Sequence, residues 1–326
     1  MRLNGGRARR GAEGAPDEEE ALRAIASLAL DDVLATARAG RIEEALSRIV
    51  ASLAAVRARS TPETWTRVLA AARAHPLRGF LHLDPFILRC YARPRGVAGD
   101  ARALDFALRG RPFDMPLADA AAALHQCVIR GQTARALRFR RDALARAIEE
   151  VVAHAPRPPS IFAAGCGHLR EWDRIMGFGS PRVGRLVAFD SDPDNLEQVK
   201  RDYASLPLEA QLGSVRDLVR GGALFGDMDL VYCSGLLELV AQPAAANLAR
   251  SLFGMVRPGG MLVLTHFLSG LTEAAFLETF MDWRMAYRTR AELIALAQDL
   301  LPDAERAWEY TESPESTLGA LTLRRR

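Results

Sequence analysis

The sequence predicts an α/β protein, in which a doubly wound Rossmann-like sheet with a C-terminal antiparallel hairpin follows an all-α N-terminal domain. Three observations predict this class. The chain has 326 residues, which is enough for two domains. Apolar residues recur at helical spacings of three and four as far as about residue 155. Beyond residue 156, short apolar runs alternate with helical segments, as they do in the βαβ units of a parallel sheet.

The N-terminal half is predicted to be helical. Residues 1–20 are rich in glycine, arginine and glutamate and lack apolar periodicity, so we expect a disordered tail. Helical periodicity fills residues 21–155, which we interpret as a lid or substrate domain. Thr61 and Pro62 mark a helix start, with proline at the first helical position. A long helix is expected over about 117–152, interrupted at a glycine.

Residues 156–326 are predicted to contain the sheet. The proline-rich stretch APRPPS, at 155–160, ends the helical pattern. The expected strands are, in order, 161–164, 186–189, 208–212, 230–233 and 261–265. Two further strand-like runs, 307–310 and 318–323, flank a turn-rich connection. We therefore expect a terminal hairpin whose last strand enters the sheet antiparallel.

The composition of the chain argues against several classes of binding partner. Lys200 is the only lysine, but the arginines are scattered and the acids leave a formal net charge of +3, so a nucleic-acid surface is not expected. No run of about 18 apolar residues predicts a membrane span, and the N-terminus lacks the apolar core of a secretory signal. The four cysteines lack CxxC spacing, which favours the cytoplasm and no metal site. We expect a small-molecule substrate, and a homodimer stays open.

A glycine turn follows the first predicted strand. Ala164 ends that strand, and Gly165, Cys166 and Gly167 follow it before the next helix. Glycines at such a turn let a ligand approach the backbone, and the helix offers free N–H groups. The second strand ends at Asp190, where an acid typically binds two ribose hydroxyls, although it can also cap the next helix. Together they predict a nucleoside site.

The next residues favour one nucleoside cofactor over another. The NAD fingerprint requires a small residue three positions after the second glycine, where this chain has Arg170. Glu171 adds an acid that would repel a pyrophosphate. A cofactor with ribose, adenine and an amino-acid tail but no phosphate fits better, which points to S-adenosylmethionine. An NAD-linked oxidoreductase is disfavoured on the same grounds.

The chain resembles the class I S-adenosylmethionine-dependent methyltransferases, and more narrowly the bacterial family of extracellular-factor, or 3-hydroxypalmitic acid methyl ester biosynthesis, methyltransferases. The resemblance extends from about residue 60 to the C-terminus. The stretches that carry it are HPLRGFLHLDPFILRCYARPRGVAGDA (75–101), GCGHLREW (165–172), DLVYCSGL (229–236), MDWRMAYR (281–288) and the more general VRPGG (256–260).

The resemblance implies a role for each turn at the sheet edge. The glycine turn would border the methionine part of the cofactor, with Glu171 or Arg170 near its amino or carboxylate group. Arg138, on the long helix, would pair with the cofactor carboxylate unless it is a solvated helix charge. The other implied positions are Asp190 at the ribose with Ser191 beside it, Ser214 and Val215 at the adenine, and Cys233, Ser234 and Gly235 over the methyl-donating sulfur.

The chain departs from the family pattern at three places. Ala163 stands where most class I enzymes carry an acid two residues before the first glycine, so Glu171 is considered as its replacement. Val97 replaces a usual tyrosine in RPRGYAGD, and GLLELV at 235–240 replaces GLYDYL. The last two changes make the expected pocket more apolar, so the relatives' substrate does not transfer directly.

Candidate catalytic and substrate residues follow from the acceptor. A carboxylate acceptor needs only positioning, whereas an alcohol needs a base. His266, directly after the fifth strand, is the favoured base, with a core histidine as the alternative reading; His168 is expected to be structural. Trp283 and Tyr287 would share a helix face over the pocket, with Arg288 as a substrate clamp. Arg95 and Asp100 would contribute from a lid loop.

The expected activity is methyl transfer to a carboxylate or hydroxyl oxygen of a small molecule, of acyl or secondary-metabolite type. An N-methyltransferase of a natural-product pathway is the alternative enzyme. A degenerate methyltransferase fold that only binds a partner is the non-enzymatic alternative, because a fold can persist without its chemistry.

Overall fold

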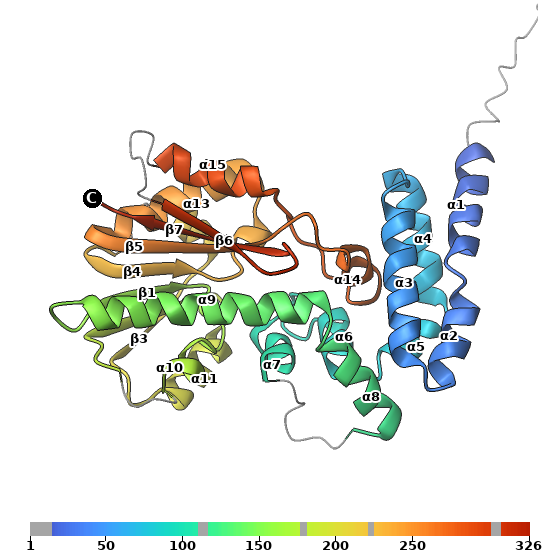
Figure 1. Ribbon diagram of the computed structural model, residues 1–326, viewed down its shortest axis with the longest axis horizontal. Helices are drawn as coiled ribbons and strands as arrows, with labels where there is room; N and C mark the ends of the chain where they lie inside the picture. The colour runs from blue at the N-terminus through green and yellow to red at the C-terminus, as the bar shows by residue number, and fades with distance from the viewer. Residues whose placement is uncertain (1–14, 110–116, 177–180, 221–224, 301–307) are drawn as a thin grey trace, which may run out of the picture.

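The computed structural model describes residues 15–109, 117–176, 181–220, 225–300 and 308–326 (Figure 1). The helices before the sheet are α1 (Ala15–Ser27), α2 (Leu30–Arg38), α3 (Ile42–Arg57), α4 (Pro62–Ala74), α5 (Leu77–Leu81), α6 (Pro85–Ala92), α7 (Ala101–Arg109), α8 (Asp119–Val128) and α9 (Gln132–His154). The strands are β1 (Ser160–Ala164), β2 (Arg185–Asp190), β3 (Leu208–Leu212), β4 (Met228–Cys233), β5 (Val256–Phe267), β6 (Trp308–Glu312) and β7 (Leu318–Arg324). The helices among them are α10 (Trp172–Met176), α11 (Pro193–Asp202), α12 (Val215–Arg220), the 3₁₀ turn η1 (Leu237–Leu239), α13 (Gln242–Met255), α14 (Ala274–Phe280) and α15 (Arg290–Leu300).

The strands form one seven-stranded sheet in the order β3-β2-β1-β4-β5-β7-β6. The first five strands pair in parallel, and β7 pairs antiparallel with both β5 and β6. The sheet is therefore the predicted doubly wound Rossmann-like sheet with its C-terminal antiparallel hairpin. Because β1 lies between β2 and β4, the chain reverses its winding direction at β1, and ligands of open α/β sheets bind at the carboxyl edge of such a switch point.

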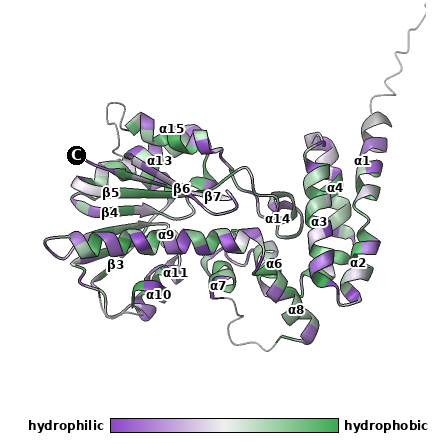
Figure 2. Cartoon of the chain, viewed as in Figure 1, coloured by the Kyte–Doolittle hydropathy of each residue, from purple (hydrophilic) through white to green (hydrophobic). Residues whose placement is uncertain are grey.

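Both faces of the sheet are covered by helices (Figure 1). On β1, Phe162 and Ala164 pack into a core shared with α12, α13 and α15, whereas Ile161 and Ala163 pack into a second core shared with α9, α10 and α11. Successive side chains of a strand point to opposite faces, so a strand buried on both sides becomes a continuous apolar run. In Figure 2 the central strands carry much green, whereas α9 carries both purple and green.

Local sequence signals account for the helix boundaries. Thr61 caps α4, its hydroxyl accepting a hydrogen bond from the amide of Thr64 at 3.1 Å, with Pro62 in the first turn as predicted. Gly131 is the N-cap that separates α8 from α9, which confirms the predicted interruption. The predicted tail is wrong for residues 15–20, which belong to α1, and residues 1–14 lie outside the described residues. Glutamate and alanine, which are frequent in α1, are strong helix formers, so the charge and composition of this segment do not by themselves indicate disorder.

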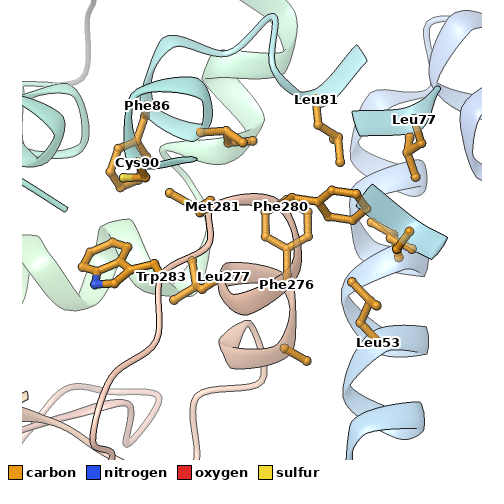
Figure 3. Close-up of a cluster of buried hydrophobic side chains, with 14 of the residues drawn as sticks. Leu53, Leu77, Leu81, Phe86, Cys90, Phe276, Leu277, Phe280, Met281 and Trp283 are labelled. Carbon is orange, nitrogen blue, oxygen red and sulfur yellow. The ribbon is translucent and has the colours of Figure 1, made fainter. Parts of the chain in front are cut away.

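The helical half and the sheet half share a core. Helix α14, which follows β5 in sequence, contacts α3 and α4 of the N-terminal bundle. In Figure 3 its Phe276 and Phe280 lie on the side of the bundle leucines, whereas Leu277 lies on the side of Trp283, and all three belong to one core with Phe86 of α6. The predicted helix across 283–287 is wrong, since α14 ends at Phe280 and the chain is then irregular as far as α15. No helix in the described ranges is long and apolar enough to cross a membrane.

Candidate functional site

A cleft lies at the carboxyl edge of the parallel strands, with a volume of about 220 Å³. Its floor comes from the turns that follow β1, β2 and β4, and its walls come from α7, α9 and the segment 97–100 between α6 and α7. We call residues 93–100 the lid loop. The cleft therefore sits at the switch point of the sheet, and the helical half covers it.

The glycine turn forms the middle of the floor. Gly165 (φ +67°) and Gly167 (φ +52°) both adopt the left-handed conformation that residues with a side chain rarely take. A Cβ on Gly165 would lie 2.7 Å from Cγ of Leu236, so the turn after β4 packs directly on it. The amides of Gly165 and Cys166 both donate to the carbonyl of Phe189, at 2.9 and 3.0 Å. These bonds fix the turn against the end of β2.

Asp190 lies beside this turn and lines the cleft with Ser191. Its Oδ2 accepts a hydrogen bond from the amide of Gly167 at 2.8 Å, and its Oδ1 accepts from the amide of Asp192 at 2.9 Å and from Asn195 Nδ2 at 3.2 Å. The helix cap of α11 is Asp192, so the alternative explanation of Asp190 as that cap does not hold. The acid and the glycine turn are brought together as predicted.

The side chain of Arg170 does not block the glycine turn. Its guanidinium makes a two-pronged contact with Asp105 of α7, with Nε to Oδ1 at 2.6 Å and Nη2 to Oδ2 at 2.9 Å, and a further bond to Asp202 at 2.8 Å. His168 also binds Asp105, with Nδ1 2.8 Å from Oδ2. Burial would raise the pKa of Asp105, but the bonds from His168 and Arg170 outweigh it and lower that pKa. This cluster fastens α7 to the glycine turn.

Glu171 is a buried acid in the wall of the cleft. The hydroxyl of Tyr232 on β4 donates to its Oε1 at 2.6 Å, and Trp172 Nε1 donates to the same hydroxyl at 3.1 Å. Burial raises the pKa of Glu171 to about 7. A cation bound beside this carboxylate would favour its charged form, so the site is suited to a positively charged group.

The lid loop contacts the cleft through Asp100, while its other predicted residue, Arg95, is directed elsewhere. Asp100 Oδ1 accepts from Arg89 and from the amide of Ala103, both at 2.8 Å, while Oδ2 is buried without a partner among the described residues. Arg95 donates to Asp192 at 2.7 Å and so ties the loop to the turn after β2. The prediction that Arg95 reaches the substrate is not supported by this geometry.

Trp283 lines the cleft, and its predicted contact with a substrate stays a prediction. A Cβ on Gly99 (φ +67°) would lie 2.5 Å from Cζ2 of Trp283, so the indole rests on the glycine of the lid loop. Phe86 meets the same ring edge-on, at 6.3 Å between centroids. The two sequence motifs RPRGVAGD and MDWRMAYR, far apart along the chain, therefore meet at one contact.

The predicted base and clamp form a separate buried cluster. Arg288 donates to the carbonyls of Leu237 at 2.9 Å and Val240 at 2.7 Å, so it supports the turn after β4. It also donates to Nε2 of His266 at 3.0 Å, which occupies that lone pair. Burial lowers the pKa of His266 to about 4. Neither side chain reaches the described lining of the cleft, and Tyr287, whose buried hydroxyl has no partner among the described residues, does not reach it either.

Arg138 is a further correction. Its guanidinium donates to the carbonyls of Ala107 at 2.9 Å and Ile129 at 2.8 Å, where it stabilises the ends of α7 and α8. Arg140, two positions along α9, lines the cleft instead. Helical geometry turns a side chain through about 200° over two residues, so a choice of the wrong arginine reverses its direction.

Arg140 forms a buried ion pair with Glu238 of η1, in which Nη2 donates to Oε1. The guanidinium also lies over the ring of Phe267, 5.0 Å from its centroid. The sequence gives little sign of this pair, because α9 carries many arginines and Glu238 lies within the apolar run GLLELV. Only the placement of η1 next to the end of β5 reveals it.

The remaining predicted cofactor residues divide into three groups. Ser234 and Gly235 line the cleft with the glycine turn, whereas Ala164 and Cys233 are fully buried strand ends behind it. Ser214 binds Asp217 through its amide at 2.7 Å and its hydroxyl at 2.8 Å, and Val215 packs against the sheet core; neither is in the described lining. The described residues contain no cluster of His, Cys, Asp and Glu that would hold a metal ion.

Comparisons with known proteins bear on the fold. No family model matches the chain, and no curated protein matches it. A solved structure described as a possible exported protein from Bordetella parapertussis is 17% identical, covers 81% of this chain and 99% of its own, and superimposes with a TM-score of 0.58. The CMeT domain of the citrinin polyketide synthase is 13% identical and covers 81% of this chain and 70% of its own, with a TM-score of 0.48. The Bordetella match is longer than the region 156–326, so the shared fold includes part of the helical half.

Proposed function

We propose that this chain is an S-adenosylmethionine-dependent methyltransferase that methylates an oxygen atom of a small molecule. The observation that carries the proposal is the convergence of Asp190, Gly165 and Gly167 in one cleft at the switch point of the sheet. An acid at the end of the second strand is placed to bind ribose hydroxyls, and the glycine turn leaves room for a ligand against the backbone.

The charges of the cleft also fit this cofactor. Asp100, Glu171 and Asp190 line it with carboxylates, and Oδ2 of Asp100 is buried without a partner among the described residues. An uncompensated buried carboxylate oxygen is costly, so it requires a donor from the ligand. S-adenosylmethionine carries an ammonium and a sulfonium and supplies an electrophilic methyl group when bound. A pyrophosphate, in contrast, would be repelled by these acids.

The chain's own residues would hold and enclose the ligand. Asp190 would bind the ribose, Glu171 and Asp100 would face the amino-acid end, and Ser234 and Gly235 would border the reacting methyl group. Trp283 and the lid loop would exclude water. Such alignment and exclusion supply much of the rate of a displacement reaction, which needs few groups that transfer protons.

Calorimetric titration with S-adenosylmethionine tests the proposal. Wild type is expected to bind, and Asp190→Ala is expected to lower the affinity by about tenfold or more, since it removes charge-assisted hydrogen bonds. Asp194→Ala, an exposed carboxylate four residues along and outside the described lining, is the matched control and should bind as wild type does. An absence of binding at millimolar ligand would leave only a protein that retains the fold without the chemistry.

A further inference from the structure

The Arg140–Glu238 pair lies toward the β4 and β5 end of the cleft, whereas Asp190 lies at the β2 end. Neighbouring strands lie about 4.8 Å apart, and β2, β1, β4 and β5 follow one another in that order. Asp190 ends β2, the glycine turn follows β1, and Phe267 ends β5. If the proposed cofactor extends from Asp190 across the glycine turn, the acceptor lies over β4 and β5. This inference rests on the proposed function for that orientation.

Each member of the pair has one buried polar atom that has no hydrogen-bond partner among the described residues. Arg140 is 6% exposed and Glu238 is 5% exposed. Oε1 of Glu238 accepts from Arg140 and from the amide of Phe267 at 3.3 Å. Nε of Arg140 and Oε2 of Glu238 are buried and have no hydrogen-bond partner among the described residues. A half-satisfied pair of this kind is costly, so it marks a place where a ligand can complete the bonding.

The unused atoms select the chemistry of that ligand. Among its fully buried atoms without a partner in the described residues, the pair offers one donor, Nε–H of Arg140, and one acceptor, Oε2 of Glu238. A carboxylate accepts only, so it would leave Oε2 unpaired and place two negative groups together. An ammonium donates only, so it would leave Nε unpaired and face a guanidinium. A hydroxyl donates and accepts, and it satisfies both atoms at once.

We propose that the methyl acceptor is a hydroxyl group held between Glu238 and Arg140. The hydroxyl oxygen forms the new bond to the methyl carbon, and its O–H proton passes to Glu238. The bond from that carbon to sulfur breaks, and sulfur keeps the electron pair as a neutral thioether. Arg140 stabilises the negative charge that develops on the oxygen. Both are catalytic residues because they touch the reacting group.

The mouth of the cleft indicates the body of the acceptor. Val97 and Leu239 line it and are 51% and 63% exposed, so they present apolar surface there. Met285 also lines the cleft. An acceptor with an apolar body would cover these side chains while its hydroxyl reaches the buried pair.

Three probes that share one apolar body provide the test: 4-butylphenol, 4-butylbenzoate and 4-butylbenzylamine. Each is titrated calorimetrically into the protein saturated with S-adenosylhomocysteine, so that binding is measured without turnover. The phenol is expected to bind about tenfold tighter than either of the others, because only it satisfies both atoms. In a labelled-methyl assay with S-adenosylmethionine, the phenol is expected to be the preferred acceptor.

Two variants locate the effect at the pair. Glu238→Gln replaces the proton acceptor, and Arg140→Lys keeps the charge but removes Nε. Each should lower phenol affinity by about tenfold and leave S-adenosylhomocysteine affinity unchanged. The controls are Glu149→Gln and Arg146→Met, exposed positions on α9 outside the described lining. If Glu238→Gln does not fold, Arg140→Lys alone decides.

The outcomes distinguish the two proposals. A protein that binds neither adenosyl compound refutes the proposed function. A protein that binds S-adenosylhomocysteine but prefers the benzoate or the benzylamine refutes the hydroxyl assignment and leaves the methyltransferase proposal intact. Phenol affinity that is unchanged in both variants also refutes the assignment.

Discussion

Replacement of Asp105 by alanine should test the cluster that fastens α7 to the glycine turn. The carboxylate is 2% exposed and receives two hydrogen bonds from Arg170 and one from His168. Its removal leaves a guanidinium that is 5% exposed, with Asp202 at 2.8 Å and Asp173 at 4.0 Å as its remaining carboxylate partners in the described residues. Breaking a buried pair from one side costs about 3–5 kcal/mol, and we expect a loss of unfolding free energy in this range.

Urea denaturation followed by circular dichroism measures this loss as a shift of the midpoint. Glu209→Ala is the matched control, because Arg185 contacts Glu209 with the same two-pronged geometry, at 2.8 and 2.7 Å, on the surface. With side chains 36% and 54% exposed, that pair should contribute only about 0–1 kcal/mol. Equal and small losses of unfolding free energy in the two variants would refute the claim that burial makes the Asp105 cluster more stabilising than the surface pair.

Three further predictions follow from single contacts. Burial raises the pKa of Glu171 to about 7, so between pH 4.5 and 7 the folded state keeps a proton that the unfolded state has released. The unfolding free energy of the wild type should therefore fall by roughly 3 kcal/mol as the pH rises from 4.5 to 7. Denaturation of Glu171→Gln across this pH range should lack that fall. Gly165→Ala places a Cβ 2.7 Å from Leu236 at positive φ, so we expect a loss of about 1–3 kcal/mol in thermal or urea unfolding; wild-type stability would contradict the strain. Arg138→Ala should leave calorimetric S-adenosylmethionine affinity unchanged and lower the thermal midpoint, since its guanidinium binds helix-end carbonyls; weakened binding would restore the sequence-based assignment.

The sequence predicted the sheet well because its signals are local. The central parallel strands contain apolar runs bounded by turn residues, the glycine turn follows β1 directly, and Asp190 ends β2. Their meeting is a consequence of topology, since adjacent parallel strands end at the same edge. Residues whose neighbours are set by strand order could therefore be assigned from sequence alone.

The walls of the cleft could not be predicted in this way. Arg138 and Arg140 are both arginines on one helix, and only the packing of α9 on the sheet decides which of them faces the cleft. The sequence places His266 directly after the fifth strand, but it lies within β5, which extends to Phe267, and its ring contacts Arg288 behind the turn after β4. The segment after α14 leaves the helix at Asp282, which adopts φ +46°, and no strong turn signal there announces the change. Side-chain direction and long-range packing decide these positions.

The course of α9 has a consequence for how the molecule unfolds. Leu137 near its start belongs to the core of the helical half, and Ile148 near its end belongs to a core of the sheet, and both lie on one continuous helix of 23 residues. Because α9 packs in both cores, unfolding of one core while the other stays folded would require α9 to break some of its own backbone hydrogen bonds. The melting of either half is thereby coupled to the melting of the other, and a chain cut at residue 155 would expose an apolar sheet face to water.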